Sequence, residues 1–572
     1  MIPESIRKLA QKVRTEIYGR DVRESIAQSM EVSGETSNEA NERSKDTATR
    51  QTDVENRFDD QIAGNTDIDE VIDARRPEGG QSYPTLRKRL DDEHKEVTAQ
   101  LAQTTLLITE PLRKIPVGNI KLPGTFPEIP FTISKIKDWS FSHGLTPQVI
   151  NDWSNATEVF IGTEANTGVD GTDKETPINI EIFISRYKQG SYNQQKNFIL
   201  SFVDEVYSPS AHSTNNLFSD IDVNVYFRSV YKTGRTIIGS VRNSHGGDFV
   251  WENHNGNVYK AIQPTGVSVD YPFNINSRDG FGMFPPSNEK KTLIDCQNEE
   301  GSFYRDLSNN TIYYHKHKLE DISDVEIARR LNVARLNQGN GKFYFEGLDF
   351  LADSYSLSGN SLSSEIYISD CTFYRGDTNA FTINGIYKVF IVDSVASYGS
   401  ADGFNYHTED TNTLAVEVNC VSYGNGEYKF IGGHSATSSN NGSTAHNGMH
   451  ILRVGCRYSR CEGSVIADIQ NCYSINIGCE VFDILPTASS TRAGFYVQNE
   501  EGVTPETEKP KYFIECRQSG YYFRRMIYAP NTTKTYYENV IGEIDKSYGL
   551  PAISENANKI RWELVESNQT VN

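Results

Sequence analysis

The feature that most constrains the fold of this chain is a repeat of short strand-like runs at a regular period. Runs such as "GKFYFEGLDF", "SEIYISDCTF", "YKVFIVDSV" and "LAVEVNCVSY" align on one inward-facing position. The aligned residues are Leu348, Cys371, Ser394, Cys420, Cys456, Cys479 and Cys516. They are separated by 23, 23, 26, 36, 23 and 37 residues, so the base period is 23 with insertions at turns. Such a period, built from strands, predicts a solenoid of stacked β-coils. The alternative, a β-sandwich, is not expected to hold this period in phase.

Two segments outside the repeat support the same fold by resemblance. "FIGTEANTGVDGTDKETPINI" (residues 160–180) resembles the Gly-Asp-Gly-Thr opening of pectate-lyase-like β-helices. "GSFYRDLSNNTIYYHKHKLEDISDVEIA" (residues 301–328) resembles a coil that recurs in that superfamily. The predicted fold class is therefore mainly β, a right-handed parallel β-helix over residues 156–545. A linker over 106–155 would precede it, and a tail over 546–572 would follow it.

Residues 1–105 have a different composition, dominated by helix formers and dense charge. A spacing of three and four residues, typical of a coiled-coil seam, runs through Ala40, Ser44, Thr47, Gln51, Val54, Phe58 and Gln61 or Ile62. Because most of these residues are small or polar, the helix would be marginal alone. We expect a helical anchor that several chains share or that a partner holds. The alternative is a disordered acidic linker.

The same region carries a second resemblance. "YGRDVRESIAQSME" (residues 18–31) and "DEVIDARRPEGGQSYPTLRKRLDDE" (residues 69–93) resemble N-terminal segments of tail-fibre, baseplate and receptor-binding proteins. Those proteins come from phages of Gram-positive bacteria, staphylococcal phages especially. The resemblance implies a virion tail protein, made in the host cytoplasm and bound to other tail or baseplate proteins through its N-terminus. It also implies a homotrimer.

Charge and cysteine usage exclude several classes of function. The formal net charge of −20 argues against a nucleic-acid partner, which requires a basic surface. The sequence has no apolar run of about 18 residues, so we expect no membrane span, and the N-terminus lacks the apolar region of a secretory signal. The eight cysteines form no CxxC pair, and most sit in apolar runs. We therefore expect buried free thiols, no metal site and no cofactor.

A recurring polar position supplies the candidate chemistry. About eight residues past the aligned column, successive coils carry Asn379, Asp402, Glu427 and Glu462. Hydrogen-bonded strands lie about 4.8 Å apart, so stacked carboxylates would repel, and one would have a raised pKa. Glycoside hydrolysis uses such a pair, one acid and one base or nucleophile. We predict Asp402 and Glu427 as that pair, with Glu462 or Asp468 able to replace either. The alternative is a solvated acidic ladder without catalytic function.

Histidines and tyrosines near the same coils are candidate glycan ligands. The polar insertion "GGHSATSSNNGSTAHNGMH" (residues 432–450) is the longest in the repeat region, and insertions in solenoids often form the binding face. The candidates are His407, Asp410, His446, Asn447, Tyr398, Tyr406 and Tyr428. Surface hydrogen bonding of the histidines and strand packing of the tyrosines are the alternatives.

These observations predict a tail spike that binds and depolymerises a host surface polysaccharide. Its target would be exopolysaccharide, poly-N-acetylglucosamine or teichoic acid of a Gram-positive wall. A hydrolase is favoured over a lyase, because no arginine stands in the "DGFNYH" coil to act as the base. No nucleophile elbow supports an esterase. A non-catalytic adhesin and a purely structural fibre remain the alternatives.

Overall fold

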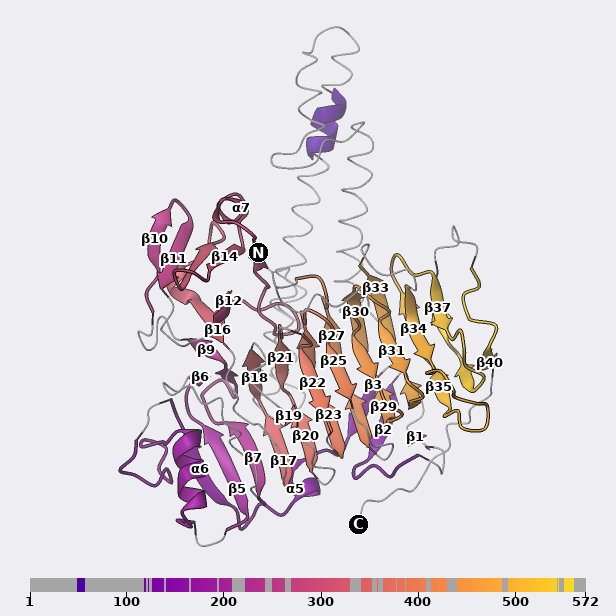
Figure 1. Ribbon diagram of the computed structural model, residues 1–572, viewed down its shortest axis with the longest axis horizontal. Helices are drawn as coiled ribbons and strands as arrows, with labels where there is room; N and C mark the ends of the chain where they lie inside the picture. Colours follow the sequence, from indigo (N-terminus) through magenta and orange to yellow (C-terminus); the bar gives the residue numbers. More distant parts are fainter. Residues whose placement is uncertain are drawn as a thin grey trace, which may run out of the picture. The chain divides into compact units, whose positions relative to one another are not determined.

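The computed structural model describes residues 49–56 and most of residues 118–559 (Figure 1). Its longer gaps are 208–221, 242–248, 263–268, 330–340, 352–356, 359–363, 408–412, 429–439, 486–491 and 545–549. The chain divides into two compact units, Met1–Pro111 and Leu112–Asn572. In the first unit residues 49–56 are helical. The rest of the predicted coiled coil, and the segment 69–93, lie outside the described residues.

The second unit is a parallel β-helix, which confirms the predicted fold class. From residue 342 onward, successive strands join a first, a second and a third parallel sheet in turn. The first sheet contains, in spatial order, β4 (Thr157–Ile161), β5 (Asn197–Phe202), β7 (Asn224–Ser229), β17 (Lys342–Glu346), β20 (Glu365–Ser369), β23 (Lys388–Val392), β26 (Leu414–Val418), β29 (His450–Val454), β32 (Tyr473–Ile477), β35 (Lys511–Ile514), β38 (Thr535–Glu538) and β40 (Ala557–Lys559).

The other two sheets complete the coils. The second sheet contains β6 (Val206–Tyr207), β8 (Thr236–Ile238), β18 (Leu348–Leu351), β21 (Thr372–Tyr374), β24 (Val395–Ser397), β27 (Val421–Tyr423), β30 (Arg457–Cys461), β33 (Glu480–Ile484), β36 (Arg517–Ser519) and β39 (Ile541–Gly542). The third contains β19 (Leu357–Ser358), β22 (Phe381–Asn384), β25 (Phe404–His407), β28 (Ser443–Ala445), β31 (Ile466–Ile469), β34 (Ala493–Gln498) and β37 (Arg525–Tyr528). Because β40 pairs in parallel with β38, the stack continues into the segment predicted as a tail.

A one-residue corner joins each first-sheet strand to the second sheet. The corner residue has a positive φ in eight successive coils: Gly347, Asp370, Asp393, Asn419, Gly455, Gly478, Glu515 and Asn539. Glycine, asparagine and aspartate tolerate this left-handed conformation best, which explains most of the residues chosen. The chain therefore turns sharply at the same point of every coil.

The aligned column of the sequence follows directly after this corner and stacks in the interior, as predicted. Its seven members are at most 1% exposed. The Cys420 and Cys456 thiols each donate to the carbonyl two residues back, at 3.5 Å, and the Ser394 hydroxyl does the same at 2.7 Å. A small side chain with a hydrogen-bond donor thus satisfies a strand carbonyl at the turn. All eight cysteines are buried and free, as the sequence predicted.

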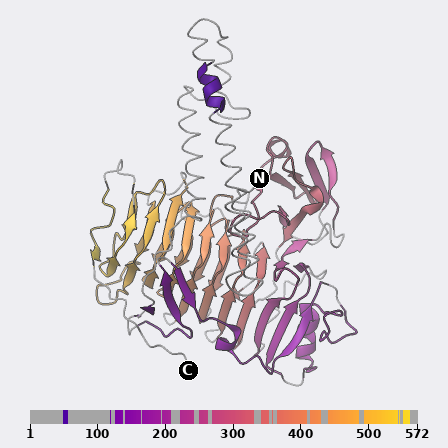
Figure 2. The same cartoon turned by 180° about the vertical axis from the view of Figure 1, so that it is seen from behind.

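The segment predicted as a linker instead covers the outer face of the first sheet. It contains β1 (Gly118–Asn119), β2 (Ile133–Lys137), β3 (Ser140–His143) and α5 (Pro147–Ile150). Figure 2 shows its strands, in indigo, crossing the strands of the β-helix. Phe131 packs edge-on against Phe390 with 5.7 Å between ring centroids, and Trp153 contacts Tyr226. We call residues 126–153 the cap segment.

Helix α6 (Ile180–Lys188) packs its apolar side against the first coils. The Asn179 side chain caps its N-terminus by accepting a hydrogen bond from the Ile182 backbone. Phe183, which is buried, meets Phe198 of β5 edge-on at 5.0 Å between centroids. In the described part of the chain, no helix has the length and apolar character needed to cross a membrane.

An antiparallel subdomain is inserted between β8 and β17. It contains β9 (Ser240–Val241), β10 (Glu252–Asn255), β11 (Val258–Ile262), β12 (Val269–Asn274), β13 (Asn288–Glu289), α7 (Leu293–Gln297), β14 (Ser302–Asp306), β15 (Thr311–His315), η1 (Ile322–Asp324) and β16 (Val325–Arg329). Residues 301–328, expected to form a coil, instead form the β14–β15 hairpin and the strand β16, which pairs antiparallel with β12 and β9. The subdomain packs on the outer face of the second sheet, where Tyr271 donates to the Tyr374 carbonyl at 3.1 Å.

Candidate functional site

The corner between the second and third sheets carries a ladder of amide and carboxylate side chains. Asn379 Oδ1 accepts a hydrogen bond from the backbone N–H of Asp402 at 2.9 Å. Asp402 Oδ1 accepts in turn from the backbone N–H of Asn441 at 2.7 Å. The side-chain amide of Asn405 donates to Asp402 Oδ2. Each rung therefore fixes the turn of the next coil.

Asp402 does not line an open cleft. Its side chain is buried, and loss of hydration raises the pKa of the carboxyl to about 6. Both oxygens are occupied by hydrogen bonds of the ladder, so we reassign Asp402 from acid catalyst to corner residue. Its neighbours in register are Asn379 and Asn441, because Phe381, Phe404 and Ser443 pair across the third sheet. Glu427 does not belong to this column.

Glu427 and Glu462 instead follow second-sheet strands of adjacent coils, β27 and β30, and the Glu462 backbone N–H donates to the Asn425 carbonyl at 3.1 Å. Glu427 forms an ion pair with Arg460, and Glu462 accepts a hydrogen bond from the side-chain amide of Asn440. A Cβ built on Gly426 would lie 2.8 Å from Glu462 Oε2. One built on Gly424 would lie 3.5 Å from Glu427 Oε2. The glycines of "GNGE" thus make room for two carboxylates at one corner, which we call the glutamate corner (Glu427, Arg460, Glu462 and Asn440).

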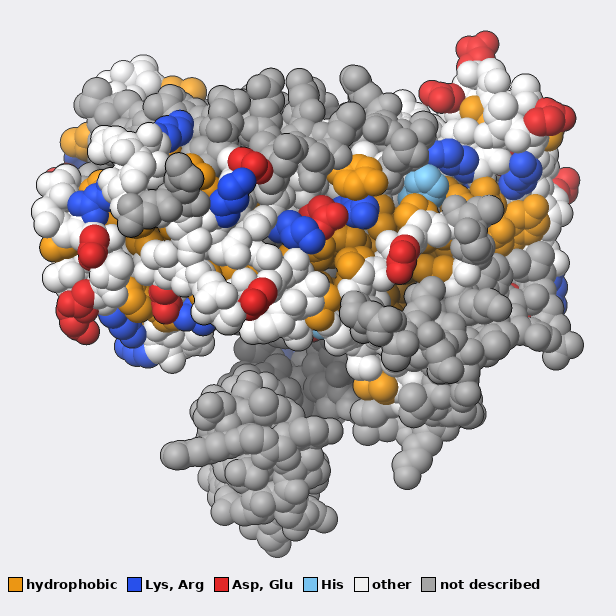
Figure 3. Space-filling view, turned by 90° about the horizontal axis from the view of Figure 1, so that it is seen from below, with side chains coloured by type: hydrophobic (Ala, Val, Ile, Leu, Met, Phe, Trp, Pro, Cys, Tyr) orange, Lys and Arg blue, Asp and Glu red, His pale blue; other side chains and the backbone are white. Residues whose placement is uncertain are grey.

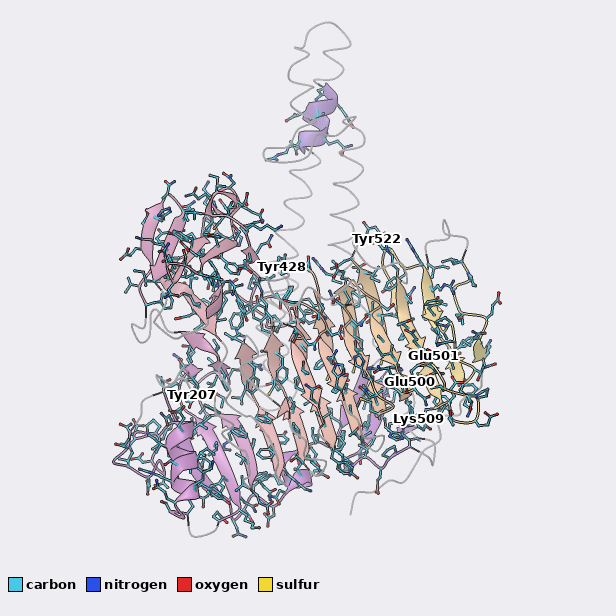
Figure 4. The ribbon with its side chains drawn as sticks, viewed as in Figure 1. Tyr207, Tyr428, Glu500, Glu501, Lys509 and Tyr522 are labelled. Atoms are coloured by element: carbon cyan, nitrogen blue, oxygen red, sulfur yellow. The ribbon has the colours of Figure 1, made fainter. Side chains whose placement is uncertain are left out.

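Two of the three predicted tyrosines lie beside the glutamate corner. The rings of Tyr398 and Tyr428 are in edge contact at 5.8 Å between centroids, and both are half-buried. Burial raises the pKa of Tyr398 far above its usual value, so its hydroxyl stays protonated. Tyr398 also contacts Tyr423, whose hydroxyl donates to Asp279 of the inserted subdomain. Figure 4 labels Tyr428 on the side of the β-helix that faces this subdomain.

Asp468 and Tyr406 point into the interior of the β-helix, which corrects both predictions. Asp468 is fully buried and pairs with Arg453, with 2.8 Å between Oδ1 and Nη1. Tyr406 is 1% exposed and lies near Glu417, which is also buried. Inward-facing positions of a strand cannot reach a surface ligand, since side chains alternate between the two faces. Neither residue is therefore part of a glycan-binding surface.

His407 and His446 form a second feature, on the third sheet. Their rings stack with 4.0 Å between centroids, at the ends of β25 and β28. Desolvation lowers the pKa of both, that of His446 to about 3, so both rings are neutral near pH 7. Asn447 follows in an exposed turn with φ 58°. Asp410 lies outside the described residues, so its predicted role stays a prediction.

One set of side chains has the spacing of metal ligands. Glu417, Cys420 and Cys456 place one oxygen and two sulfurs within 4.8 Å of one another, all buried. The Glu417 oxygens already accept hydrogen bonds from Ser443 and Tyr458, at 2.6 and 2.5 Å. Burial also raises the pKa of both thiols well above 9, which disfavours the thiolates that a metal requires. The set is accounted for by hydrogen bonding within the protein.

Sequence reasoning missed Arg460 and Asn440. The coil of Asp402 contains no arginine at this corner, but Arg460 stands one coil beyond Glu427 and reaches back to it. In the sequence, the feature that could have identified Arg460 was its position two residues before Glu462. Asn440 lies within the long polar insertion of residues 432–450, whose path the sequence does not reveal. Both residues join the glutamate corner only through the register of the coils.

Comparisons with known proteins identify no family. No protein-family model matches the chain, and no curated protein matches it. Among solved structures, one described as a glycoside hydrolase aligns with TM-score 0.41 and 10% identity, over 67% of this chain and 92% of its own. The pectate lyase Pel9A aligns with TM-score 0.30 and 8% identity, over 70% and 73%. We draw neither an activity nor a substrate from these likenesses.

Proposed function

We propose that this chain is a phage tail spike that binds and hydrolyses a host surface polysaccharide at the glutamate corner. The observation that carries the proposal is that Glu427 and Glu462 stand at the same corner of adjacent coils, beside the rings of Tyr398 and Tyr428. Paired carboxylates are the catalytic groups of most glycoside hydrolases. Aromatic rings next to them suit the apolar face of a sugar ring.

The contacts of the two acids suggest their roles. Glu427 is held by the guanidinium of Arg460, an arrangement that suits a base or nucleophile. Glu462 is held by the neutral amide of Asn440, so it is our candidate for the acid that protonates the leaving oxygen. The substrate would be the exopolysaccharide, poly-N-acetylglucosamine or teichoic acid of a Gram-positive wall.

The virion role is proposed from the N-terminal resemblance. Residues 1–105 would attach the protein to tail or baseplate proteins, as a homotrimer, and leave the β-helix to meet the cell surface. The sequence motifs of 18–31 and 69–93 support this assignment. Copurification with assembled tails, lost on deletion of residues 1–105, is the expected result.

A non-catalytic adhesin is the second candidate, and one observation favours it. The Glu427 carboxylate is already engaged by Arg460, as it would be in a site that only binds. A lyase is the third candidate, since Arg460 brings to this corner the arginine that the Asp402 coil lacks. An unsaturated, light-absorbing product that disappears with chelator would identify a calcium-dependent lyase.

New reducing ends from purified host wall polysaccharide would test hydrolysis. We expect Glu427→Gln and Glu462→Gln each to slow their release by about 10²-fold or more. The matched control is Glu500→Gln, an exposed glutamate labelled in Figure 4 toward the C-terminal coils, which should keep full activity. Unchanged cleavage in both glutamine variants would remove the glutamate corner as the active site. Binding without any cleavage by the wild type would favour the adhesin.

A further inference from the structure

A row of solvent-facing side chains crosses the five-stranded sheet of the inserted subdomain. Its strands are ordered β10-β11-β15-β14-β13. The register pairs Tyr304 with Tyr313, Tyr313 with Lys260, and Lys260 with Glu252. With His254, which contacts Tyr313, these residues form what we call the tyrosine strip. It crosses β10, β11, β15 and β14 of the subdomain, whose strands β10, β11 and β14 are labelled at the upper left of Figure 1.

Alternation along the strands shows that the strip faces solvent. Phe303 and Tyr314 are buried in the core of the subdomain, so the adjacent Tyr304 and Tyr313 point the other way. Ile262, which follows Lys260 by two residues and shares its face, is 65% exposed. Tyr304 and Tyr313 are each partly exposed, so this face is partly aromatic and open to solvent between β10 and β14, while α7 contacts its end at Ser302.

The rings of Tyr304 and Tyr313 form a stacked pair on this surface. They stack with 6.0 Å between centroids and 30° between planes, and His254 meets Tyr313 edge-on at 5.1 Å. Within the described parts of the chain, neither tyrosine hydroxyl has a hydrogen-bond partner. A ligand can therefore pack on the rings and accept or donate hydrogen bonds at both hydroxyls. A tyrosine side chain loses little conformational entropy when a ligand packs on it, because it has only two side-chain torsions.

The charges of the strip favour an uncharged ligand. Lys260 and Glu252 pair with each other at 3.3 Å and leave no net charge. A polyanion such as teichoic acid would meet a single, already neutralised lysine. A neutral pyranose, by contrast, offers an apolar C–H face to the rings and hydroxyls to the polar groups.

We propose that the tyrosine strip is a second carbohydrate-binding surface, which holds uncharged sugar rings of the polysaccharide outside the glutamate corner. The inference takes its polymer class from the proposed function, but it requires no catalysis. Binding at two sites on one chain raises the effective concentration of polymer at the protein, which would retain the spike on the cell between cuts.

Titration calorimetry of the full-length protein with a hexamer of N-acetylglucosamine tests this proposal. All variants carry Glu427→Gln, so that the probe is not cut, and a separate cleavage assay reports on the glutamate corner. We expect Tyr304→Ala with Tyr313→Ala to weaken binding by about tenfold or more, since buried aromatic contacts dominate such surfaces. Tyr313→Phe keeps the ring and should bind within about threefold of the reference. Tyr521→Ala, at a tyrosine that is 48% exposed on another part of the chain, is the matched control.

Two results would overturn the proposal, whatever the cleavage assay shows. One is equal affinity for the hexamer in the double-alanine variant and the reference, or no binding by the reference. The other is strip-dependent binding of glycerol-phosphate teichoic acid without binding of the hexamer, which would assign the surface to an anionic polymer. Far-UV circular dichroism establishes that the double variant is folded, and Tyr313→Phe gives the second comparison if it is not.

Discussion

At the scale of single residues, the β-helix uses polar side chains to complete its turns. Asn379 and Asp402 each accept a hydrogen bond from the backbone N–H of the next rung, and the thiols of the inner column cap strand carbonyls. An acid in such a ladder carries a cost, because burial disfavours its charge. The amide of Asn379 performs the same structural task for the Asp402 backbone without that cost.

We therefore expect Asp402→Asn to stabilise the protein at pH 7. Burial raises the pKa of this carboxyl from 3.8 to about 6, so its contribution to stability is fully present below pH 4 and is lost as pH rises through 6. That difference corresponds to about 3 kcal/mol, an upper estimate for the gain on substitution. The side-chain amide of Asn405 can flip, so that its Oδ1 accepts a hydrogen bond from the amide of the substituted asparagine. This Oδ1 has no hydrogen-bond partner among the described residues.

Urea unfolding at pH 4, 5 and 7 measures the effect. The free energy of unfolding of the wild type should fall between pH 4 and 6, and that of the asparagine variant should not. Asp402→Ala should be less stable by about 2 kcal/mol, because the Asn441 N–H loses its acceptor. Destabilisation by the asparagine substitution at pH 7 would mean that the charge itself is required.

At the scale of elements, the corner after each first-sheet strand is set by backbone conformation. Eight successive corners use a residue with positive φ, and only some of them are glycine. The conformation repeats because each coil must leave the first sheet at the same angle for its next strand to pair with the coil before it. Several of these residues also use their side chains, since Asp370 pairs with Arg235, Asp393 contacts His143 and Asn419 donates to the Phe141 carbonyl.

Asn539 is a suitable position at which to test the backbone requirement of the corner. It is exposed, its φ is 49°, and its side chain has no hydrogen bond among the described contacts. Asn539→Gly should leave the free energy of unfolding nearly unchanged, whereas Asn539→Val should lower it by about 1–2 kcal/mol, because a β-branched residue is strained in the left-handed region. Thermal unfolding measures the stability of both variants. Equal stabilities would show that a β-branched residue is accommodated at the corner without strain.

At the scale of the whole molecule, segments far apart in the chain cover the two outer faces of the coils. The cap segment packs on the first sheet, and the inserted subdomain packs on the second. On the face seen in Figure 3, acidic and basic side chains are interspersed, with hydrophobic side chains exposed between them. Much of the apolar surface of the coils is therefore buried by segments outside the repeat.

Phe131→Ala should lower the free energy of unfolding by about 3 kcal/mol, since it empties a buried contact with Phe390 of the first sheet. Ile136, which is 41% exposed in the same hairpin, supplies the control, and Ile136→Ala should stay within about 0.5 kcal/mol of the wild type. Guanidinium unfolding compares the variants. Similar small effects for both would indicate that the cap segment and the coils are stabilised independently.

The candidate site was only partly predictable, and the reason lies in the insertions. Counting eight residues from the column located Asn379 and Asp402 correctly, because those coils have short turns. The same count in the next coil reached Glu427, while the residue in register is Asn441, 21 residues past Cys420. The period identified the inward column after the corner, but it did not fix the facing of the third-sheet strands, where Asp468 and Tyr406 point into the interior.

The stacked coils could be predicted from the sequence, because the period, the alternating strands and the small donors at each corner are local features that every coil repeats. Pairing each coil with its neighbour through the same backbone hydrogen bonds then leaves little choice of fold. The sequence did not show which acids share a corner, where Arg460 reaches, or that the segment from β9 to β16 forms a separate antiparallel subdomain. Those contacts depend on insertions of unequal length, whose paths are fixed by packing across the molecule rather than by any pattern along the chain.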